Sequence, residues 1–169
     1  MSTEDSDKVE SRVRDSLQML GATYEWMPCD PSLADTALFC AHYGISPNRS
    51  ANTIIVAGKK DPQQFAACLV LADSRLDVNR VVSRLMGVKR LSFATAEETL
   101  SLTGMMVGGV TLFGLPPIPI YIDSRVMATD YVVLGGGSRS AKVKIAPSEL
   151  RRLPGSSVIE GLAIPRQGS

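Results

Sequence analysis

The stretch GMMVGGVTLFGLPPIPIYID, residues 104–123, decides how the rest of the chain is interpreted. It holds four glycines and three prolines among apolar side chains, and the glycine triplet of residues 135–137 follows soon after it. A polar linker would lack the apolar residues, and a helix would not tolerate so many glycines and prolines. An apolar, glycine-rich loop can wrap closely around a ligand with its backbone N–H groups facing inward. A buried connector between strands would have the same composition, so the stretch alone leaves both interpretations open.

Length and composition predict one globular domain. The chain has 169 residues and a formal net charge of +1, and we expect a single domain over residues 1–153 with a loosely attached C-terminal tail over 154–169. The first ten residues, MSTEDSDKVE, are acidic and polar, unlike a signal or transit peptide, so we expect a cytoplasmic protein. A net charge near zero argues against bulk binding of nucleic acid, but it is compatible with a local basic patch.

Several classes of chemistry lack the residues they need. The three cysteines are widely spaced without a zinc pattern, and the single histidine, His42, lies in a predicted helix without a nucleophile elbow. Neither a phosphate-binding loop nor a G-x-G-x-x-G motif is present. The remaining class is a small-ligand pocket lined by backbone amides, with phosphate-binding basic residues drawn from Lys89, Arg90, Arg125, Arg139, Lys142, Lys144, Arg151 and Arg152.

Periodicity and capping signals predict short helices and strands in mixed order. In residues 141–145, alternation places Lys142 and Lys144 on the face opposite the apolar side chains. Residues 53–57 and 65–72 are expected to pair as antiparallel strands. The order predicts an α+β or α/β domain around a mixed sheet, with helices at 8–20, 32–43, 78–86, 96–103 and 147–150, and further strands at 22–27, 118–122, 131–134 and 141–145.

An ordered set of short motifs resembles the YbaK/prolyl-tRNA-synthetase-associated domain family, the freestanding aminoacyl-tRNA deacylases related to an editing insertion of prolyl-tRNA synthetases. The resemblance covers about a hundred residues. The matching segments are Asn52–Val56, Ala72–Asp77, Leu85–Lys89, Ala94–Glu98, Leu102–Gly104, Gly108–Gly114, Tyr121–Asp123, Gly135–Arg139 and Ala146–Leu150.

The resemblance implies a mixed β-sheet that forms a partly closed, barrel-like body with helices outside. It implies a trans-editing hydrolase that cleaves the ester joining a wrong amino acid to tRNA, commonly proline tRNA carrying alanine or cysteine. It implies no metal and no cofactor. The expected partners are the aminoacylated 3′ end of tRNA and an aminoacyl-tRNA synthetase, without a membrane.

The resemblance also implies roles for single residues. Gly108 and Gly109 hold the ester through backbone amides, and Asn52, at the usual lysine position, contacts the terminal ribose or phosphate. The expected substrate-binding residues are Val110, Thr111, Leu112, Asp123, Gly136, Gly137, Ser138 and Arg139. Two positions depart from the family pattern, since Asn52 replaces a lysine and Leu112 replaces a proline. A family member that binds without hydrolysis, and a structural protein with a filled pocket, are the alternatives.

Overall fold

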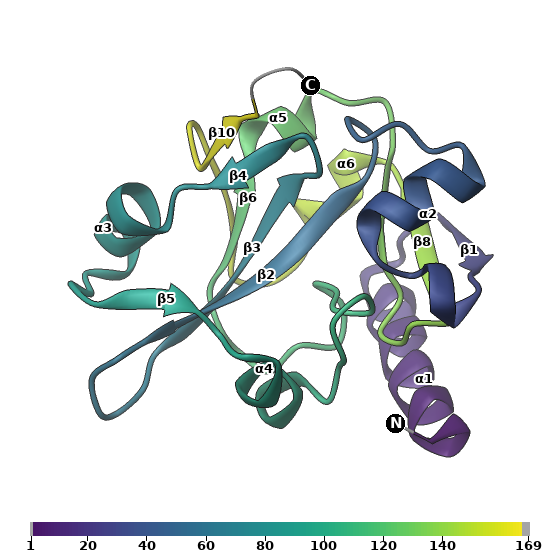
Figure 1. Cartoon of the computed structure of the whole chain (residues 1–169), viewed down its shortest axis with the longest axis horizontal. Helices are drawn as coiled ribbons and strands as arrows, with labels where there is room; N and C mark the ends of the chain where they lie inside the picture. Colours follow the sequence, from purple (N-terminus) through teal and green to yellow (C-terminus); the bar gives the residue numbers. More distant parts are fainter. Residues whose placement is uncertain (1, 167–169) are drawn as a thin grey trace.

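A computed structural model describes residues 2–166 of the chain. Within this part, the strands form three sheets (Figure 1). The largest sheet has five strands in the order β5 (Leu91–Phe93), β2 (Ala51–Gly58), β3 (Phe65–Leu71), β6 (Ile120–Asp123) and β9 (Ser156–Ile159). The second contains β1 (Tyr24–Pro28), β8 (Ala141–Ile145) and β7 (Val132–Gly135), and the third pairs β10 (Ala163–Pro165) with β4 (Ser74–Leu76).

The five-stranded sheet is mixed, as predicted. Strands β2 and β3 pair antiparallel with Ala51 opposite Leu71, whereas β6 runs parallel to both β3 and β9. A single bridge, from Ser50 to Val133, connects this sheet to the three-stranded one. The expected partly closed barrel is not supported, because the strands described in residues 2–166 form separate open sheets with no continuous ladder around a barrel.

The helices lie around the sheets and are mostly short. The two capping boxes, Ser2 with Asp5 and Thr95 with Glu98, fix the starts of the first and fourth α-helices. None of the helices in the described part combines the length and apolar character needed to cross a membrane. The α-helices are α1 (Thr3–Leu20), α2 (Thr36–Tyr43), α3 (Ser83–Met86), α4 (Ala96–Thr103), α5 (Ser124–Met127) and α6 (Pro147–Leu150).

Two predicted helices are divided in the structure. Residues 32–43 become a 3₁₀ turn (Pro31–Leu33) and α2, because Asp35 adopts an extended backbone conformation between them. The carbonyl of Ala34, at this break, accepts a hydrogen bond from the Lys142 side chain. Residues 78–86 begin as a π-helical turn (Val78–Val82) before α3. Local periodicity predicted both helices but not the interruptions.

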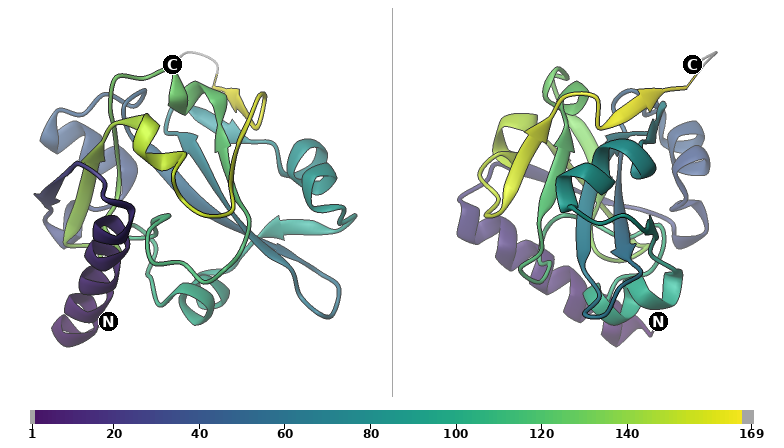
Figure 2. Two further views of the ribbon diagram at one scale, coloured as in Figure 1. Left: turned by 180° about the vertical axis from the view of Figure 1, so that it is seen from behind. Right: turned by 90° about the vertical axis from the view of Figure 1, so that its left-hand side faces the viewer.

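Both faces of the five-stranded sheet are buried, which explains the continuous apolar runs of β2 and β3. One face packs against α1 and the three-stranded sheet, with Val13 and Leu17 of α1 fully buried. The opposite face packs against β4, β10 and the π-helical turn. Figures 1 and 2 show α1, α2 and the three-stranded sheet at one end of the molecule, with α3 and β5 at the other.

The prediction of a loosely attached tail is wrong over residues 156–165. Strand β9 pairs with β6, strand β10 pairs with β4, and Leu162 between them has no exposed surface. The strand β6 is also internal despite Pro119, because this proline precedes the strand and its carbonyl accepts a hydrogen bond from the Ala67 amide (2.9 Å). Residues 167–169 of the predicted tail lie outside the described part.

Candidate active site

A cavity of about 300 Å³ lies between the first half of β2, the glycine-rich stretch and the three-stranded sheet. Of the predicted site residues, Asn52, Gly108 and Val110 line it. The other lining residues are Asp35, Thr36, Ser50, Ala51, Thr53, Ile54, Ile55, Phe93, Ala94, Thr99, Val107, Val133, Leu134, Gly135 and Lys142.

Two glycine segments form one wall of this cavity by direct backbone contact. We call residues 105–114 the glycine loop and residues 135–139 the glycine turn. The Gly137 amide donates to the Gly109 carbonyl at 2.8 Å. A Cβ added at Gly109 would lie 2.6 Å from the Ser138 carbonyl carbon, and one added at Gly135 would overlap the Val110 carbonyl oxygen. The close approach therefore requires glycine on both sides.

The backbone amides of this wall are largely used inside the protein. Gly109 donates to the Met106 carbonyl at 2.9 Å, and Gly136 donates to the Ala141 carbonyl at 3.0 Å. With the Gly137 amide bonded to Gly109, the amides of these three glycines, one of which was expected to hold the ester, are already satisfied. A close-packed backbone contact needs partners for its own N–H groups, so it leaves few for a substrate.

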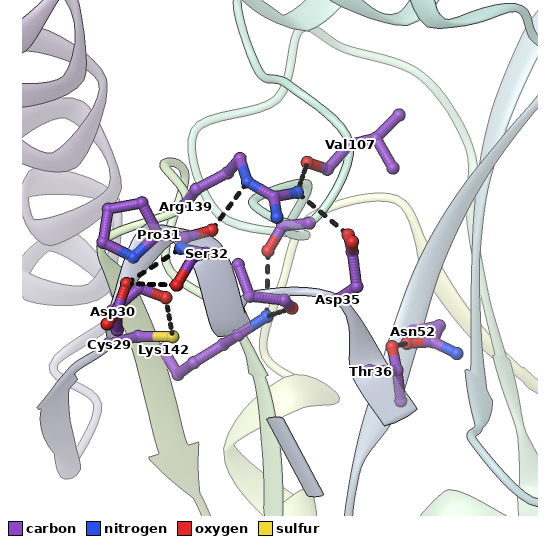
Figure 3. Close-up of polar contacts among 12 residues, drawn as sticks. Cys29, Asp30, Pro31, Ser32, Asp35, Thr36, Asn52, Val107, Arg139 and Lys142 are labelled. Atoms are coloured by element: carbon purple, nitrogen blue, oxygen red, sulfur yellow. Dashed lines mark hydrogen bonds and ion pairs between the residues drawn. The ribbon is translucent and has the colours of Figure 1, made fainter. Parts of the chain in front are cut away.

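Asn52 lies near the start of β2 and is fixed by a neighbour. The Thr36 hydroxyl, at the first position of α2, donates to Asn52 Oδ1 at 2.6 Å (Figure 3). This contact holds the amide at the cavity wall and leaves its NH₂ group as a hydrogen-bond donor. Asn52 thus supplies a neutral donor at the position where a lysine was expected.

Lys142 supplies an ammonium group to the same cavity from β8. Its Nζ donates to the Gly108 carbonyl at 2.8 Å and to the Ala34 carbonyl at 2.9 Å (Figure 3). Only 7% of this residue is exposed, and burial lowers the pKa of the ammonium from its usual value. Alternation along β8 placed Lys142 on the face opposite the apolar side chains, and on that face its ammonium is covered by Ala34. The local sequence gave no signal for this burial.

Arg139 connects three segments rather than lining the cavity. Its Nε donates to the Pro31 carbonyl at 3.0 Å, and one terminal nitrogen donates to the Val107 carbonyl and to Asp35 Oδ1 (2.8 and 2.9 Å; Figure 3). The hydrogen bond from Arg139 lowers the pKa of the Asp35 carboxyl. Arg139 therefore holds the glycine loop against the segment before α2.

Four other predicted residues lie outside the cavity lining. Ser138 points to α1, where its hydroxyl donates to Glu10 Oε2 at 2.7 Å. Thr111 and Leu112 are buried beside the glycine loop. Asp123 is buried at the end of β6, and burial raises the pKa of its carboxyl. Their assignment as substrate-binding residues therefore stays a prediction, and none of the four lines this cavity.

The cavity combines one ammonium, one neutral amide and an apolar wall. Its titratable lining residues are Asp35, which is paired with Arg139, and Lys142. A carboxylate with a lowered pKa is a weak general base, so Asp35 is a poor candidate for removing a proton. Among the described residues, no cluster of three or more His, Cys, Asp or Glu side chains could hold a metal ion. The arrangement suits a ligand with a polar carbonyl and a small apolar group.

Comparison with known families identifies the family of the chain. Residues 30–153 match the aminoacyl-tRNA editing domain family, so the chain belongs to that family. Among curated relatives, the uncharacterized protein YwhH of Bacillus subtilis (strain 168) is 29% identical over 116 residues, which span 68% of this chain and 71% of YwhH.

Solved structures show the same fold. The hypothetical protein APE2540 superposes with a TM-score of 0.81 at 27% identity, covering 90% of this chain and 99% of that one. A candidate trans-editing enzyme for prolyl tRNA synthetase superposes with a TM-score of 0.78 at 26% identity, covering 95% and 97%. The family and fold together support aminoacyl-tRNA editing as the general activity.

Proposed function

We propose that this chain is a trans-editing hydrolase that cleaves the ester between a wrong amino acid and the 3′ end of a tRNA. The observation that carries the proposal is the buried Lys142 ammonium in the wall of the cavity that also contains Asn52. A volume of about 300 Å³ is at the lower end of the range for small-ligand sites. It suits a small aminoacyl group with part of the terminal ribose.

The apolar wall faces the amino-acid side chain. Ile55, Val107 and Val110 provide this wall, and a small wrong amino acid such as alanine or cysteine fits against it. Selection by size is modest, because each methylene is worth about 1–3 kcal/mol. We therefore place proline tRNA carrying alanine or cysteine first among the substrates. The structure of the candidate trans-editing enzyme for prolyl tRNA synthetase supports this order.

Lys142 binds the reacting carbonyl. An ammonium has three N–H donors, two of which hold the Gly108 and Ala34 carbonyls. The third donates to the ester carbonyl oxygen, whose negative charge grows as water attacks. The carbon–oxygen bond to the ribose then breaks, and the proton of the attacking water passes to the ribose oxygen. One such preorganised donor contributes about 2.7–4 kcal/mol to transition-state stabilisation.

The other predicted residues position this group. Asn52 donates its NH₂ to the terminal ribose or phosphate, while Thr36 holds its carbonyl oxygen. The glycine turn, residues 135–139, keeps the glycine loop at the distance that Lys142 requires. Thr111, Leu112 and Asp123 support the cavity from the protein interior, so leucine at the usual proline position changes core packing and leaves the cavity lining intact.

A panel of mischarged tRNAs tests the proposal. Purified protein is incubated with tRNAs carrying labelled wrong amino acids, starting with proline tRNA charged with alanine or cysteine, and the release of amino acid is compared with a protein-free control. We expect the protein to hydrolyse at least one mischarged tRNA of the panel and to leave correctly charged prolyl-tRNA intact. Rates equal to the protein-free control across the panel would overturn the proposal.

A binding protein without hydrolysis is the second candidate. It is favoured by the neutral Asn52 and by the internally satisfied amides of Gly109, Gly136 and Gly137. The variant Asn52→Lys separates the two functions. If lysine creates hydrolysis that the wild type lacks, the wild-type protein is a binding protein with a degenerate site. If lysine only changes the rate of hydrolysis that the wild type already shows, the wild-type protein is an enzyme. Association with a synthetase and a cytoplasmic location belong to the hydrolase proposal.

A further inference from the structure

A second hollow, of about 200 Å³, lies at the tip of the β2–β3 hairpin. The hairpin turn and the turn after α3 are side by side, because the Lys59 amide donates to the Arg90 carbonyl at 3.0 Å. We call this hollow and its flanking residues, Lys59 and Arg90, the basic groove. Its lining residues are Gly58, Lys60, Pro62, Gln64, Gly87, Val88 and Lys89.

The basic groove carries four exposed cations, namely Lys59, Lys60, Lys89 and Arg90. None of them forms a salt bridge within residues 2–166. The acidic groups of the adjoining segments are Asp61 in the hairpin turn and Glu97 and Glu98 in the first turn of α4, and the Glu98 carboxylate accepts a hydrogen bond from Gln63. The cations outnumber these carboxylates, so the groove favours an anionic partner.

An exposed aromatic ring lies between the groove and the cavity. Phe93 ends β5, three residues after Arg90, and it also lines the candidate active site. It is 56% exposed, which is unusual for a phenylalanine in a strand beside a pocket. Exposed aromatic rings next to basic residues are the combination by which proteins bind single-stranded nucleic acid.

The spacing suits an extended nucleic-acid strand. Asn52 lies in β2 and Lys59 directly follows its last residue, Gly58, seven residues further along the chain, which corresponds to about 23 Å at a rise near 3.3 Å per residue. Figure 1 shows the hairpin extending from the body beside β5. The cavity, the Phe93 ring and the basic groove therefore follow one another along this edge of the sheet.

We propose that Phe93 and the basic groove bind the 3′ strand of the tRNA acceptor end while the ester occupies the cavity. Phe93 stacks against a base next to the ester, and the four cations of the groove contact phosphates further along the strand. The proposal rests on the proposed function, because that function places the ester in the cavity. The new proposal adds an RNA-binding surface outside the cavity.

Kinetics on two substrates test the aromatic contact. The variant Phe93→Ala is compared with Phe93→Leu on mischarged tRNA and on the methyl ester of the same amino acid. Loss of one stacked base lowers kcat/KM on tRNA by about 5- to 150-fold, while leucine gives a comparable fall because it cannot stack. Because Phe93 also lines the cavity, the contact is judged by the ratio of the two effects, and the fall on tRNA should exceed the fall on the methyl ester. Equal falls on both substrates would show a packing role and overturn the contact.

Binding of uncharged tRNA tests the groove without requiring hydrolysis. In the fourfold variant, Lys59, Lys60, Lys89 and Arg90 are each replaced by Gln, and affinity is measured by fluorescence anisotropy across salt concentrations. Losing four phosphate contacts flattens the slope of log affinity against log salt by about 3. A control carrying Lys8→Gln and Arg14→Gln changes two exposed cations of α1 and keeps the wild-type slope.

The two proposals fail in different ways. Suppose that the wild-type protein hydrolyses no mischarged tRNA, and that the fourfold variant binds tRNA more weakly than the wild type. This result would refute the proposed hydrolase activity and support tRNA binding by the basic groove. A fourfold variant with wild-type affinity and salt slope overturns the groove, whatever the hydrolysis result. Circular dichroism of the Phe93 variants and of the fourfold variant checks that they fold. Folding is expected because all the altered side chains are exposed.

Discussion

Replacing Lys142 by methionine separates its structural role from its catalytic one. Methionine keeps most of the apolar stem and removes the ammonium, so the Ala34 and Gly108 carbonyls lose their donor. Each buried acceptor left unpaired costs about 1–3 kcal/mol. The substitution also removes the cost of burying a charged ammonium, which has no hydrogen bond to a carboxylate in the described part. This gain offsets some of the loss. We expect a net loss of about 1–3 kcal/mol.

Urea unfolding and deacylation kinetics measure the two effects. With a slope near 2 kcal/mol/M, the unfolding midpoint should fall by roughly 0.5–1.5 M. Loss of an oxyanion donor should lower kcat by about 10²–10³ on mischarged tRNA. The control is Lys144→Met, on the same strand, whose ammonium lies 4.4 Å from the Tyr131 ring centre. This control should keep kcat. A Lys142→Met enzyme with wild-type kcat would refute the catalytic role.

The pH dependence gives an independent check on Lys142. Burial lowers the pKa of its ammonium, so the charge is lost at a lower pH than in an ordinary lysine. Enzyme activity should therefore fall as pH rises through the folded-state pKa, after subtraction of spontaneous ester hydrolysis. The contribution to stability has the opposite sign, since a buried neutral amine is less unfavourable than a buried ammonium. Lys142→Arg stays charged, so an unchanged alkaline fall in this variant would contradict the assignment.

Three further predictions concern other parts of the chain. Gly135→Ala, whose added methyl group would overlap the Val110 carbonyl oxygen, should lower stability by about 1–3 kcal/mol and the thermal midpoint with it. Leu162→Ala should cost about 2–5 kcal/mol in urea unfolding, because the side chain is fully buried; a loss near zero would contradict the integration of the C-terminal strands. Asn52→Lys should change kcat/KM on mischarged tRNA, and an unchanged value would exclude Asn52 from the site.

Local signals in the sequence were sufficient for the elements whose ends are capped nearby. The Thr95–Glu98 capping box predicted α4, and Gly104 ends it in a left-handed conformation. Apolar runs predicted β2 and β3, and their antiparallel pairing is confirmed. The signals in these cases lie within a few residues of the element itself. They are therefore visible in a single sequence.

Non-local contacts account for what the sequence did not show. Alternation placed Lys142 opposite the apolar side chains of its strand, but it gave no sign that Ala34, more than a hundred residues away in the chain, covers it there. The β9 and β10 strands are short and pair with β6 and β4, which precede them at a distance. Arg139 and Ser138 were placed on the correct turn, but their partners, Asp35 and Glu10, could not be anticipated. Side-chain direction here depends on tertiary packing.

The backbone contact between the glycine loop and the glycine turn has a consequence for how this site can diverge. Any side chain larger than hydrogen at Gly109 or Gly135 would overlap the opposing backbone, so this wall accepts almost no substitution. New substrate preferences must arise on the other walls, whose lining residues include Val107 and Phe93. The fold thus divides the site into a fixed half and a variable half. Relatives with different amino-acid specificities should differ on the second half.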